Sequence, residues 1–286
     1  MPRYKKRFCS PSSCLVAPAL LAALLGSAAR TVGAAAQSPP PAEQIKAQLI
    51  DNFLQDQQAL QLYVHREHVT TEKDGAREGH TLRVWYVLGH EINKTIALDD
   101  RPISAGELAA GQESAVKHAA EAAQKPPAKT GMLVFSGHEY PFSKLANDFV
   151  YGPAAVRRWD GRTVWVYPAS PNPHAESRSR EEKLLLHTAG EVWVDAADLH
   201  IIRISMHLTS PVKYGFGVLA TVRGANLNLV LERHSAGEWL PQEADFSVLA
   251  TVLLVKTISR AKRTTYSDYQ PDDQADDQPD DKMEAR

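Results

Sequence analysis

Cysteine is almost missing from this sequence of 286 residues, in which only Cys9 and Cys14 occur. Both lie in the first 36 residues, so the remaining 250 residues contain none. This excludes a disulfide framework, a zinc site built on cysteine and a cysteine nucleophile for that part of the chain. Its stability must come from an ordinary apolar core, which a chain of this length can bury.

An excess of either charge is also missing, because 32 Lys and Arg residues face 34 Asp and Glu residues. The near-neutral total excludes a strongly basic nucleic-acid-binding protein, and no nucleic-acid partner is predicted. The charge is nevertheless unevenly placed, since the first 36 residues hold five basic residues and no acid. The rest of the chain has 27 basic and 34 acidic residues, a net charge of −7.

The longest apolar run, residues 15–29, is shorter than the roughly 20 residues that cross a bilayer. It follows a cationic segment and precedes small residues, an order that predicts a secretory signal peptide over residues 1–36, cleaved between Ala36 and Gln37. A single membrane anchor is the alternative. No cysteine for lipid attachment follows the run, and no Arg-Arg pair precedes it. We therefore predict general export to the periplasm or medium, with no stable membrane span after cleavage.

Beyond a proline-rich linker over residues 37–41, apolar residues at helical spacing predict a helix over residues 42–61. Alternating patterns then predict strands over residues 63–71, 80–88 and 91–98. Ser104 and Glu107 fit a capping box that opens an alanine-rich helical insertion over residues 104–125. This helix has few large apolar residues, so we expect it to be exposed and weakly packed.

The second half of the chain predicts a long series of strands, at residues 149–158, 163–169, 184–194, 199–208, 212–222, 225–234, 239–250 and 252–266. Asp160-Gly161 is a strong hairpin signal, and residues 171–182 are interpreted as a loop. No alternation of strands with helices is present, which excludes a doubly wound parallel sheet. The acidic residues 270–286 predict a disordered tail after a domain over residues 42–269.

Alternation along the strands places apolar residues on one face of this sheet and mixed residues on the other. Only two helices are predicted for about ten strands, which is too few to cover the apolar face of a flat sheet. We therefore expect the sheet to curve strongly around this face. The predicted fold is therefore α+β and mainly antiparallel β, a curved half-barrel with helices on its concave side. Either the helices fill the concavity, or an apolar cavity remains. The candidate cavity residues are Val192, Val194, Ile202, Ile204, Leu227, Leu229, Phe246 and Val248.

Sequence signatures of enzymes and metal sites are missing. The eleven histidines form no His-Glu-x-x-His motif, and no Gly-x-Ser-x-Gly or phosphate-binding glycine loop occurs. The acidic pairs near the C-terminus lack the glycine and final glutamate of a calcium loop. Residues 136–139 are interpreted as a loop leading to a short helix. No catalytic residue, cofactor or metal ligand is predicted.

Three stretches carry a family resemblance: YVHREHVTTEKDGAREGHTLRVWYVLGHEINKTIALDDRPIS, GEVWVDAADLHIIRISMHL and LNLVLERHSAGEWLPQEADFSVLATVLLVKTISRAKRTTYSDYQ. They resemble the LolA-like outer-membrane lipoprotein-sorting proteins, in a branch of unassigned role. In that family a glycine opens a strand that ends in aspartate, and the next strand carries an arginine, here Gly190, Asp195 and Arg203. A late turn with glycine and tryptophan matches Gly237 and Trp239.

The resemblance covers roughly residues 43–269 and implies a half-open antiparallel barrel that holds acyl chains. The alanine-rich insertion and the acidic tail depart from the family pattern. The leading hypothesis is an exported, non-enzymatic carrier of a lipid or lipoprotein acyl chain in the cell envelope. The alternative is an envelope interaction or sensor module, with a filled core and a protein partner. A hydrolase would rest only on scattered polar residues.

Overall fold

The computed structural model describes residues 38–135, 138–177, 179–215, 219–235 and 237–272. The predicted signal peptide with its cleavage site at Ala36 and Gln37, and nearly all of the predicted acidic tail, lie outside these ranges. The residues from Ser38 onward form one compact unit. In the described ranges, no helix is both long and apolar enough to cross a membrane.

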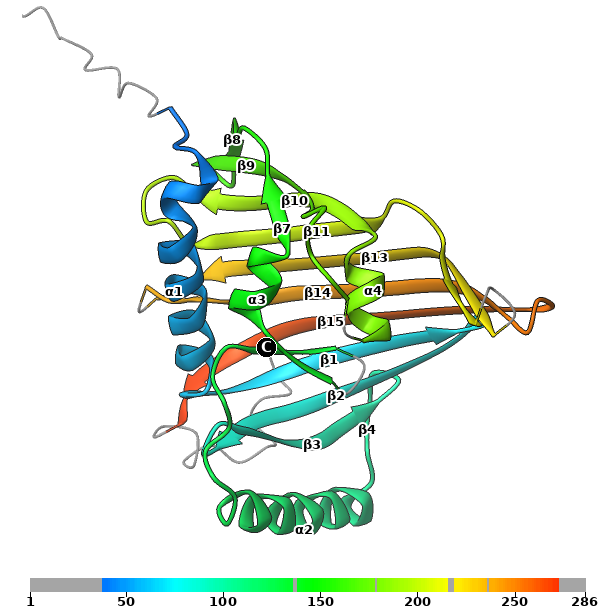
Figure 1. Ribbon diagram of the computed structural model, residues 1–286. Helices are drawn as coiled ribbons and strands as arrows, with labels where there is room; N and C mark the ends of the chain where they lie inside the picture. Colours follow the sequence, from blue (N-terminus) through cyan, green and yellow to red (C-terminus); the bar gives the residue numbers. More distant parts are fainter. Residues whose placement is uncertain (1–37, 136–137, 178, 216–218, 236, 273–286) are drawn as a thin grey trace, which may run out of the picture. The chain divides into compact units, whose positions relative to one another are not determined.

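One antiparallel sheet of 13 strands carries the fold (Figure 1). Its order is β4-β3-β2-β1-β15-β14-β13-β11-β10-β9-β7, with β12 beside β13 and β8 beside β9. The end strands β4 and β7 do not pair with each other, so the sheet stays open. The predicted class, mainly antiparallel β in a curved half-barrel, is confirmed. The strands are β1 (Tyr63–Lys73), β2 (Ala76–Val87), β3 (His90–Leu98), β4 (Arg101–Pro102), β7 (Phe149–Tyr151), β8 (Ala155–Trp159), β9 (Arg162–Pro171), β10 (Thr188–Asp195), β11 (Ile201–Leu208), β12 (Val212–Tyr214), β13 (Ala220–Arg233), β14 (Trp239–Val252) and β15 (Lys256–Pro271).

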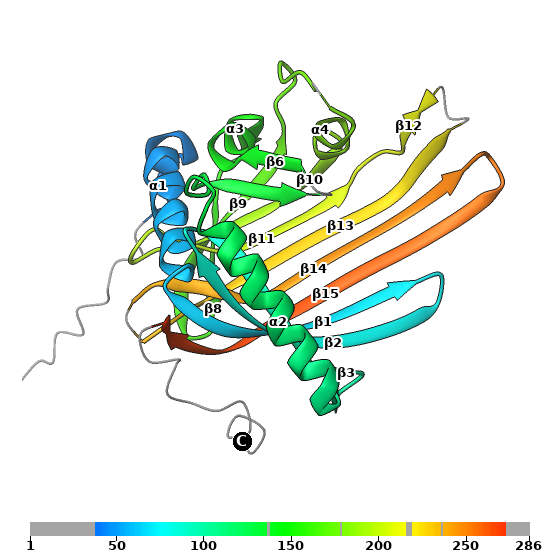
Figure 2. The same cartoon turned by 90° about the horizontal axis from the view of Figure 1, so that it is seen from below.

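Three helices lie over one face of this sheet: α1 (Ala42–Leu60), α3 (Phe142–Asn147) and α4 (Arg180–Leu185) (Figures 1 and 2). A separate two-stranded sheet, β5 (Met132–Phe135) and β6 (His138–Pro141), leads into α3. The helix α1 buries its predicted apolar stripe, Ile45, Leu49 and Phe53, against the sheet. It crosses the strands at the end of the sheet where β14 begins.

The insertion helix α2 (Ala105–Ala122) begins with the predicted capping box. The Ser104 hydroxyl accepts a hydrogen bond from the Glu107 N–H, and the Glu107 carboxylate accepts one from the Ser104 N–H. Only Ala115 and Ala122 are buried, against Ile92 of β3, so the predicted exposed, weakly packed helix is confirmed. Strand alternation places Ile92 on the face opposite to the one that α1 covers, and α2 therefore lies outside the concavity.

Three local predictions need correction. The expected break near Thr251 lies at Leu253–Val255 instead, because two leucines adopt a turn conformation that sequence rules assign to glycine or asparagine. The strand β13 runs unbroken through Gly224, where a bulge absorbs the residue that looked like a boundary. Residues 180–185, expected mostly as loop, form α4, because the Ser179 hydroxyl accepts a hydrogen bond from the Glu182 N–H and caps the helix.

Candidate functional site

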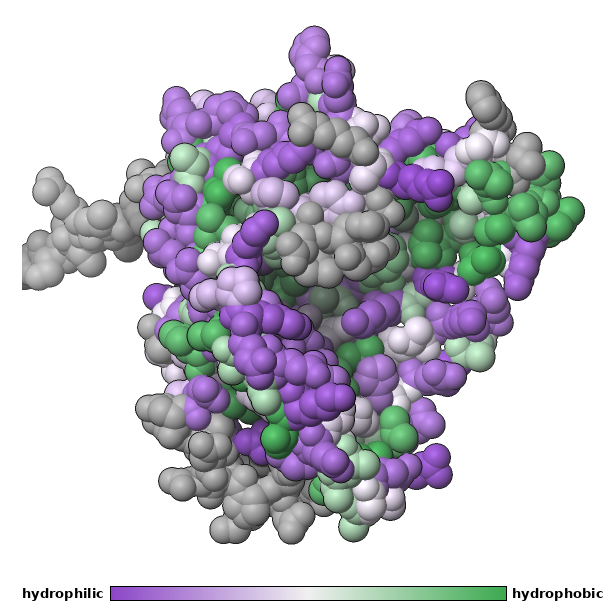
Figure 3. Space-filling model, turned by 60° about the horizontal axis from the view of Figure 1, so that its bottom comes forward, coloured by the Kyte–Doolittle hydropathy of each residue, from purple (hydrophilic) through white to green (hydrophobic). Residues whose placement is uncertain are grey.

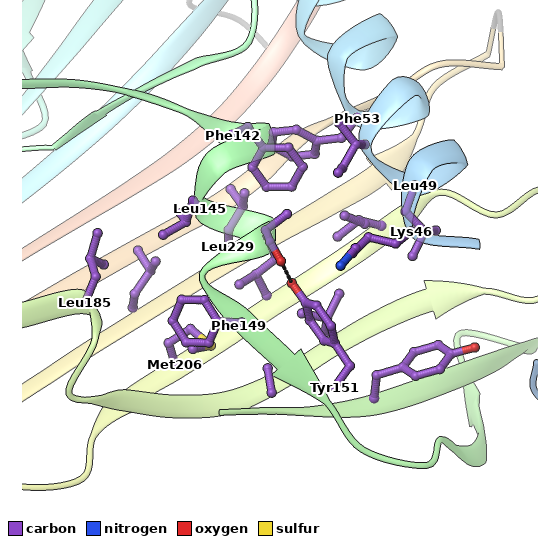
Figure 4. Close-up of a pocket in the computed structure, with 18 of the residues that line it drawn as sticks. Lys46, Leu49, Phe53, Phe142, Leu145, Phe149, Tyr151, Leu185, Met206 and Leu229 are labelled. Carbon is purple, nitrogen blue, oxygen red and sulfur yellow. Dashed lines mark hydrogen bonds between the residues drawn. The ribbon is translucent and has the colours of Figure 1, made fainter. Parts of the chain in front are cut away.

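An apolar cavity of about 230 Å³ lies between α1, α3 and the concave face of the sheet (Figure 4). The helices therefore do not fill the concavity. Aliphatic and aromatic side chains form nearly all of its wall. The lining residues are Ala42, Lys46, Leu49, Ile50, Phe53, Tyr140, Phe142, Leu145, Ala146, Phe149, Tyr151, Tyr167, Ala169, Leu185, Thr188, Val192, Ile201, Ile204, Met206, Leu227, Leu229 and Ala244.

The roof of the cavity is held by aromatic contacts between helices. The rings of Phe53 on α1 and Phe142 on α3 stack with centroids 4.1 Å apart. The Tyr151 hydroxyl donates to the Ala146 carbonyl oxygen at 3.2 Å, which ties β7 to the end of α3 (Figure 4). These contacts fix both helices over the sheet while leaving space beneath them.

The floor of the cavity consists of side chains that neighbouring strands bring side by side. Ile204 pairs with Leu229, and Leu229 pairs with Ala244 on β14. The small Ala244 on β14 and Ala169 on β9 leave room that larger residues would occupy. Antiparallel pairing thus converts the alternation of separate sequence segments into one apolar surface.

The eight residues proposed from the sequence divide into three groups. Val192, Ile204, Leu227 and Leu229 line the cavity. Phe246 and Val248 line a second, wider groove farther along the same face. The other two, Val194 and Ile202, are packed within the core beneath.

The placement of Ile202 shows why alternation alone misplaced a residue. Trp193 pairs with Arg203 and Val194 pairs with Ile201, so Ile202 is the extra residue of a bulge in β11. Because a bulge interrupts the alternation of faces, Ile201 lines the cavity and Ile202 does not.

Several of the lining residues that sequence reasoning missed come from short elements. Phe149 and Tyr151 lie on the three-residue strand β7, and Leu185 ends the six-residue helix α4. Phe149 and Tyr151 alternate, which was the available signal, but a strand this short has no reliable period. The cavity side of α1, by contrast, followed from helical spacing.

Polar groups at the cavity are few and paired. Lys46 is the charged residue of the lining, and its ammonium lies 2.7 Å from the Glu43 carboxylate. Burial, with a smaller contribution from the charge of Glu43, raises the pKa of Tyr151 to about 12. Burial likewise raises the pKa of Tyr167 to about 12, so both phenols stay neutral near pH 7. Such a lining suits an apolar ligand.

The same face continues from the cavity into an open groove of about 780 Å³. Along β14, Ala244, Phe246, Val248 and Val252 all point to this face, because they are separated by even numbers of residues. These side chains form an apolar track that leads from the cavity to the far end of the sheet. Three cations, Arg180, Arg260 and Lys262, also line the groove.

The helix α1 is fixed at its C-terminal half by two polar side chains. The Asn52 amide donates to the carbonyl oxygens of Asp198 and Leu199 at 3.3 and 2.8 Å. The buried Asp56 carboxylate accepts a hydrogen bond from the Trp239 N–H at 3.1 Å and contacts His200 at 2.8 Å. These bonds set the position of α1, and so the height of the cavity.

The ion pair of His200 with Asp56 predicts a pH-dependent stability. Burial by itself lowers the pKa of His200, but the hydrogen bond and charge of Asp56 outweigh it and raise the pKa above the ordinary 6.5. A raised pKa stabilises the folded state fully below 6.5, and this contribution is lost as the pH rises through the higher value. We expect the free energy of unfolding to decrease across this interval, as measured by urea denaturation at closely spaced pH values.

The matched variant for this prediction is His200→Gln, which keeps a hydrogen-bond donor near Asp56 but cannot titrate. The free energy of unfolding of this variant should not show the decrease that the titration of His200 causes. The pH dependence that other titratable groups cause should remain. An unchanged decrease in this variant would assign the effect to another residue.

Among the described residues, no group of three or more His, Cys, Asp or Glu side chains is placed to hold a metal ion.

No family model and no curated protein sequence matches the chain. Several solved structures resemble it. A domain from Vibrio parahaemolyticus described as an outer membrane lipoprotein-sorting protein is 9% identical, with 83% of this chain and 97% of that one covered and a TM-score of 0.34. A DUF1329 family protein from Desulfovibrio piger is 10% identical, with 80% of this chain and 93% of that one covered and a TM-score of 0.33. A chain of the Pseudomonas aeruginosa MucA/MucB complex is 9% identical, with 78% of this chain and 99% of that one covered and a TM-score of 0.26. The first of these structures carries the description of the lipoprotein-sorting family that the sequence motifs resemble.

Proposed function

We propose that this protein is an exported, non-enzymatic carrier that holds the acyl chain of a lipid or lipoprotein in the cell envelope. The observation that carries the proposal is the cavity under α1 and α3, whose wall is almost entirely aliphatic and aromatic. The apolar track along β14 extends this surface into an open groove. An acyl chain could enter along the groove and end beneath the helices.

The dimensions of the track fit such a ligand. Eight residue steps separate Ala244 from Val252, and a strand rises about 3.4 Å per residue, which gives a track of about 27 Å. The hydrocarbon core of a bilayer is about 30 Å thick and contains two leaflets, so one chain needs about half of that length. Burial contributes about 0.8 kcal/mol per methylene, enough to hold a long chain without a charged anchor.

The alternative, an interaction module with a filled core, predicts a closed concavity. The cavity and the groove favour a ligand instead, because side chains that evolved only for packing would close spaces of this size. Export is proposed from the N-terminal sequence pattern, and the mass of the protein recovered from the periplasm tests cleavage after Ala36.

The decisive substitution is Leu229→Gln, which places an amide in the middle of the cavity floor. Leu229 is half-buried and lines the cavity, so the fold should tolerate the change while the ligand loses an apolar contact. We expect the dissociation constant of a fluorescent fatty acid to rise about tenfold. Titration followed by probe fluorescence measures this change.

The matched control is Val230→Gln on the next residue of β13. Val230 is also half-buried, but it pairs with Arg203 on the opposite face of the sheet. The affinity of the Val230→Gln variant for the probe should equal that of the unmodified protein. Equal affinities in both variants, or lipid-free protein in every preparation examined by native mass spectrometry, would contradict the proposal.

A further inference from the structure

The turn between β14 and β15 exposes large aliphatic side chains at one end of the sheet. Leu253, Leu254 and Val255 are 63%, 65% and 86% exposed, and the neighbouring Leu219 is 53% exposed. The Leu253 N–H donates to the Leu219 carbonyl oxygen at 3.2 Å, so the four residues belong to one surface, here called the apolar tip. Figure 3 shows hydrophobic side chains gathered at this end of the molecule.

The backbone of the apolar tip is unusual for its residues. Leu253 and Leu254 have φ of 50° and 64°, and the Val255 N–H donates to the Val252 carbonyl oxygen at 3.3 Å. Two central residues with positive φ are the pattern of a type I′ turn, which strongly favours Asn-Gly. Leucine at these positions strains the backbone and exposes apolar surface to water. A turn that places leucine at positive φ and also exposes it to water indicates a functional requirement for the leucines.

Cations surround the apolar tip on the concave side. Lys256 opens β15, and Arg260 and Lys262 follow on the wall of the groove. Across the groove lies Arg180. Within the described residues, none of these four cations has a carboxylate within 4.0 Å.

Two of the nearby acids, Glu72 and Asp74, are turned away from this cationic surface, whereas Glu78 pairs with Thr71, the partner of Lys262, and shares its face two strands away. Asp74 is held at the neighbouring hairpin, where its carboxylate accepts a hydrogen bond from the Ser259 N–H at 3.0 Å. Glu72 pairs with Ala261, whereas Arg260 and Lys262 alternate with Ala261 and face the groove. The mouth of the groove is therefore cationic, with an apolar projection at its edge.

We propose that the apolar tip inserts into the surface of a lipid bilayer that contains anionic headgroups. The aliphatic side chains would enter the boundary between headgroups and acyl chains, and Lys256, Arg260 and Lys262 would contact the anionic groups. The end of the groove, lined by Leu219, Val252 and Leu253, would then open toward the bilayer. This docking goes beyond the carrier function and does not depend on the identity of the cargo.

The composition of this surface favours a bilayer over a protein partner. Protein interfaces are enriched in aromatic side chains and arginine, and leucine and valine are under-represented among the residues that dominate their binding energy. The apolar tip consists of leucine and valine, with lysine at its base. Charge complementarity with an anionic surface and continuity with the groove both fit a membrane.

The test uses the double variant Leu253→Asn, Leu254→Gly, which supplies the residues that the turn prefers. The protein is isolated in the form that cells accumulate, and every variant is prepared in the same form. In a flotation assay with vesicles of phosphatidylcholine and phosphatidylglycerol, we expect the unmodified protein to bind and the double variant to bind at least about tenfold more weakly. Because the new turn is less strained, thermal unfolding should show equal or higher stability, which separates lost docking from lost folding.

Two further variants sharpen the test. Lys256→Gln should weaken binding about fivefold, and binding by the unmodified protein should weaken with added salt or with vesicles of phosphatidylcholine alone. Val116→Asn, which replaces an exposed valine on α2, should leave binding unchanged.

Equal vesicle binding by the double variant and the unmodified protein would overturn the proposal. A concentration-dependent dimer that the double variant abolishes, without vesicle binding by either form, would also overturn it and assign the apolar tip to a second copy of the chain. Fatty-acid affinity measured in solution should be the same for the unmodified protein and for the single variant Leu254→Gly, which alters the apolar tip but no residue that lines the groove, and this variant should also bind vesicles more weakly. That measurement separates a failure of docking from a failure of the carrier function.

Discussion

Gly190→Ala should lower the free energy of unfolding by about 3 kcal/mol or more, because β10 has no space for a Cβ atom at this position. A Cβ built on Gly190 would lie 1.9 Å from the Ser205 carbonyl oxygen and 2.9 Å from the Met206 Cα. Both are backbone atoms of the paired strand β11, so no side-chain rotation can relieve the clash. The two strands must separate, and they form part of the cavity floor. Urea denaturation of the variant measures the loss.

The control for this prediction is the same substitution at Gly106 in α2, where a Cβ meets no atom within 4 Å. Alanine favours a helix over glycine by up to about 1 kcal/mol, so Gly106→Ala should be neutral or stabilising. A Gly190→Ala variant as stable as Gly106→Ala would show that the two strands can separate at little cost.

Asp195→Ala should lower the free energy of unfolding by about 3 kcal/mol at pH 7. The Asp195 carboxylate is 1% exposed and accepts hydrogen bonds from the Ala197 and Asp198 N–H groups at 2.8 and 3.3 Å. It also accepts a hydrogen bond from the Arg162 guanidinium, which stacks over the Trp239 ring. Removal of the carboxylate leaves these donors unpaired and loosens the turn after β10.

The pH dependence of this loss follows from the pKa of Asp195. Burial by itself raises that pKa, but the hydrogen bond and charge of Arg162 and the backbone donor outweigh it and lower the pKa below the ordinary 3.8. A lowered pKa gives stability that is present above 3.8 and lost as the pH falls through the folded-state value. The difference between Asp195→Ala and the unmodified protein should therefore shrink in acid.

The control for this prediction is Asp51→Ala, because Asp51 is exposed on α1. Removing this carboxylate should change the stability by no more than about 0.5 kcal/mol. A similarly small change for Asp195→Ala would mean that the buried network contributes little.

The turn that Asp195 organises also presents the Asp198 and Leu199 carbonyl oxygens to Asn52 on α1. Because these bonds position α1 over the cavity, Asp195→Ala should also weaken the binding of the fatty-acid probe.

Local sequence rules predicted the elements that have a long period or a strong terminal signal. The helix α1 and the strands β1 to β3 follow from spacing, and the capping box of Ser104 and Glu107 follows from local hydrogen bonding. The turn at Asp160-Gly161 follows from the conformational freedom of these residues. In each case the interactions lie within a few residues of one another along the chain.

The bounds of short elements and the bulges escaped these rules. The strand β7 is the first part of the strand predicted over residues 149–158, and its pairing with the distant β9 sets its bounds. The helix α4 combines the local Ser179 cap with a hydrogen bond from the distant Tyr214 to the Arg180 carbonyl oxygen. The bulge at Ile202 changed which of Ile201 and Ile202 lines the cavity, although both are apolar. A local pattern cannot encode a register that depends on the partner strand.

The sequence by itself determined that this chain forms an antiparallel sheet with one apolar face, because alternation is a property of neighbouring residues. It also determined the absence of cysteine after residue 36 and of known catalytic motifs. Only the tertiary structure decided that the helices leave a cavity, since its volume depends on where Asn52 and Asp56 hold α1 against distant turns. The tertiary structure likewise decided that Leu253 and Leu254 project into water, because their turn follows from how β14 and β15 pair.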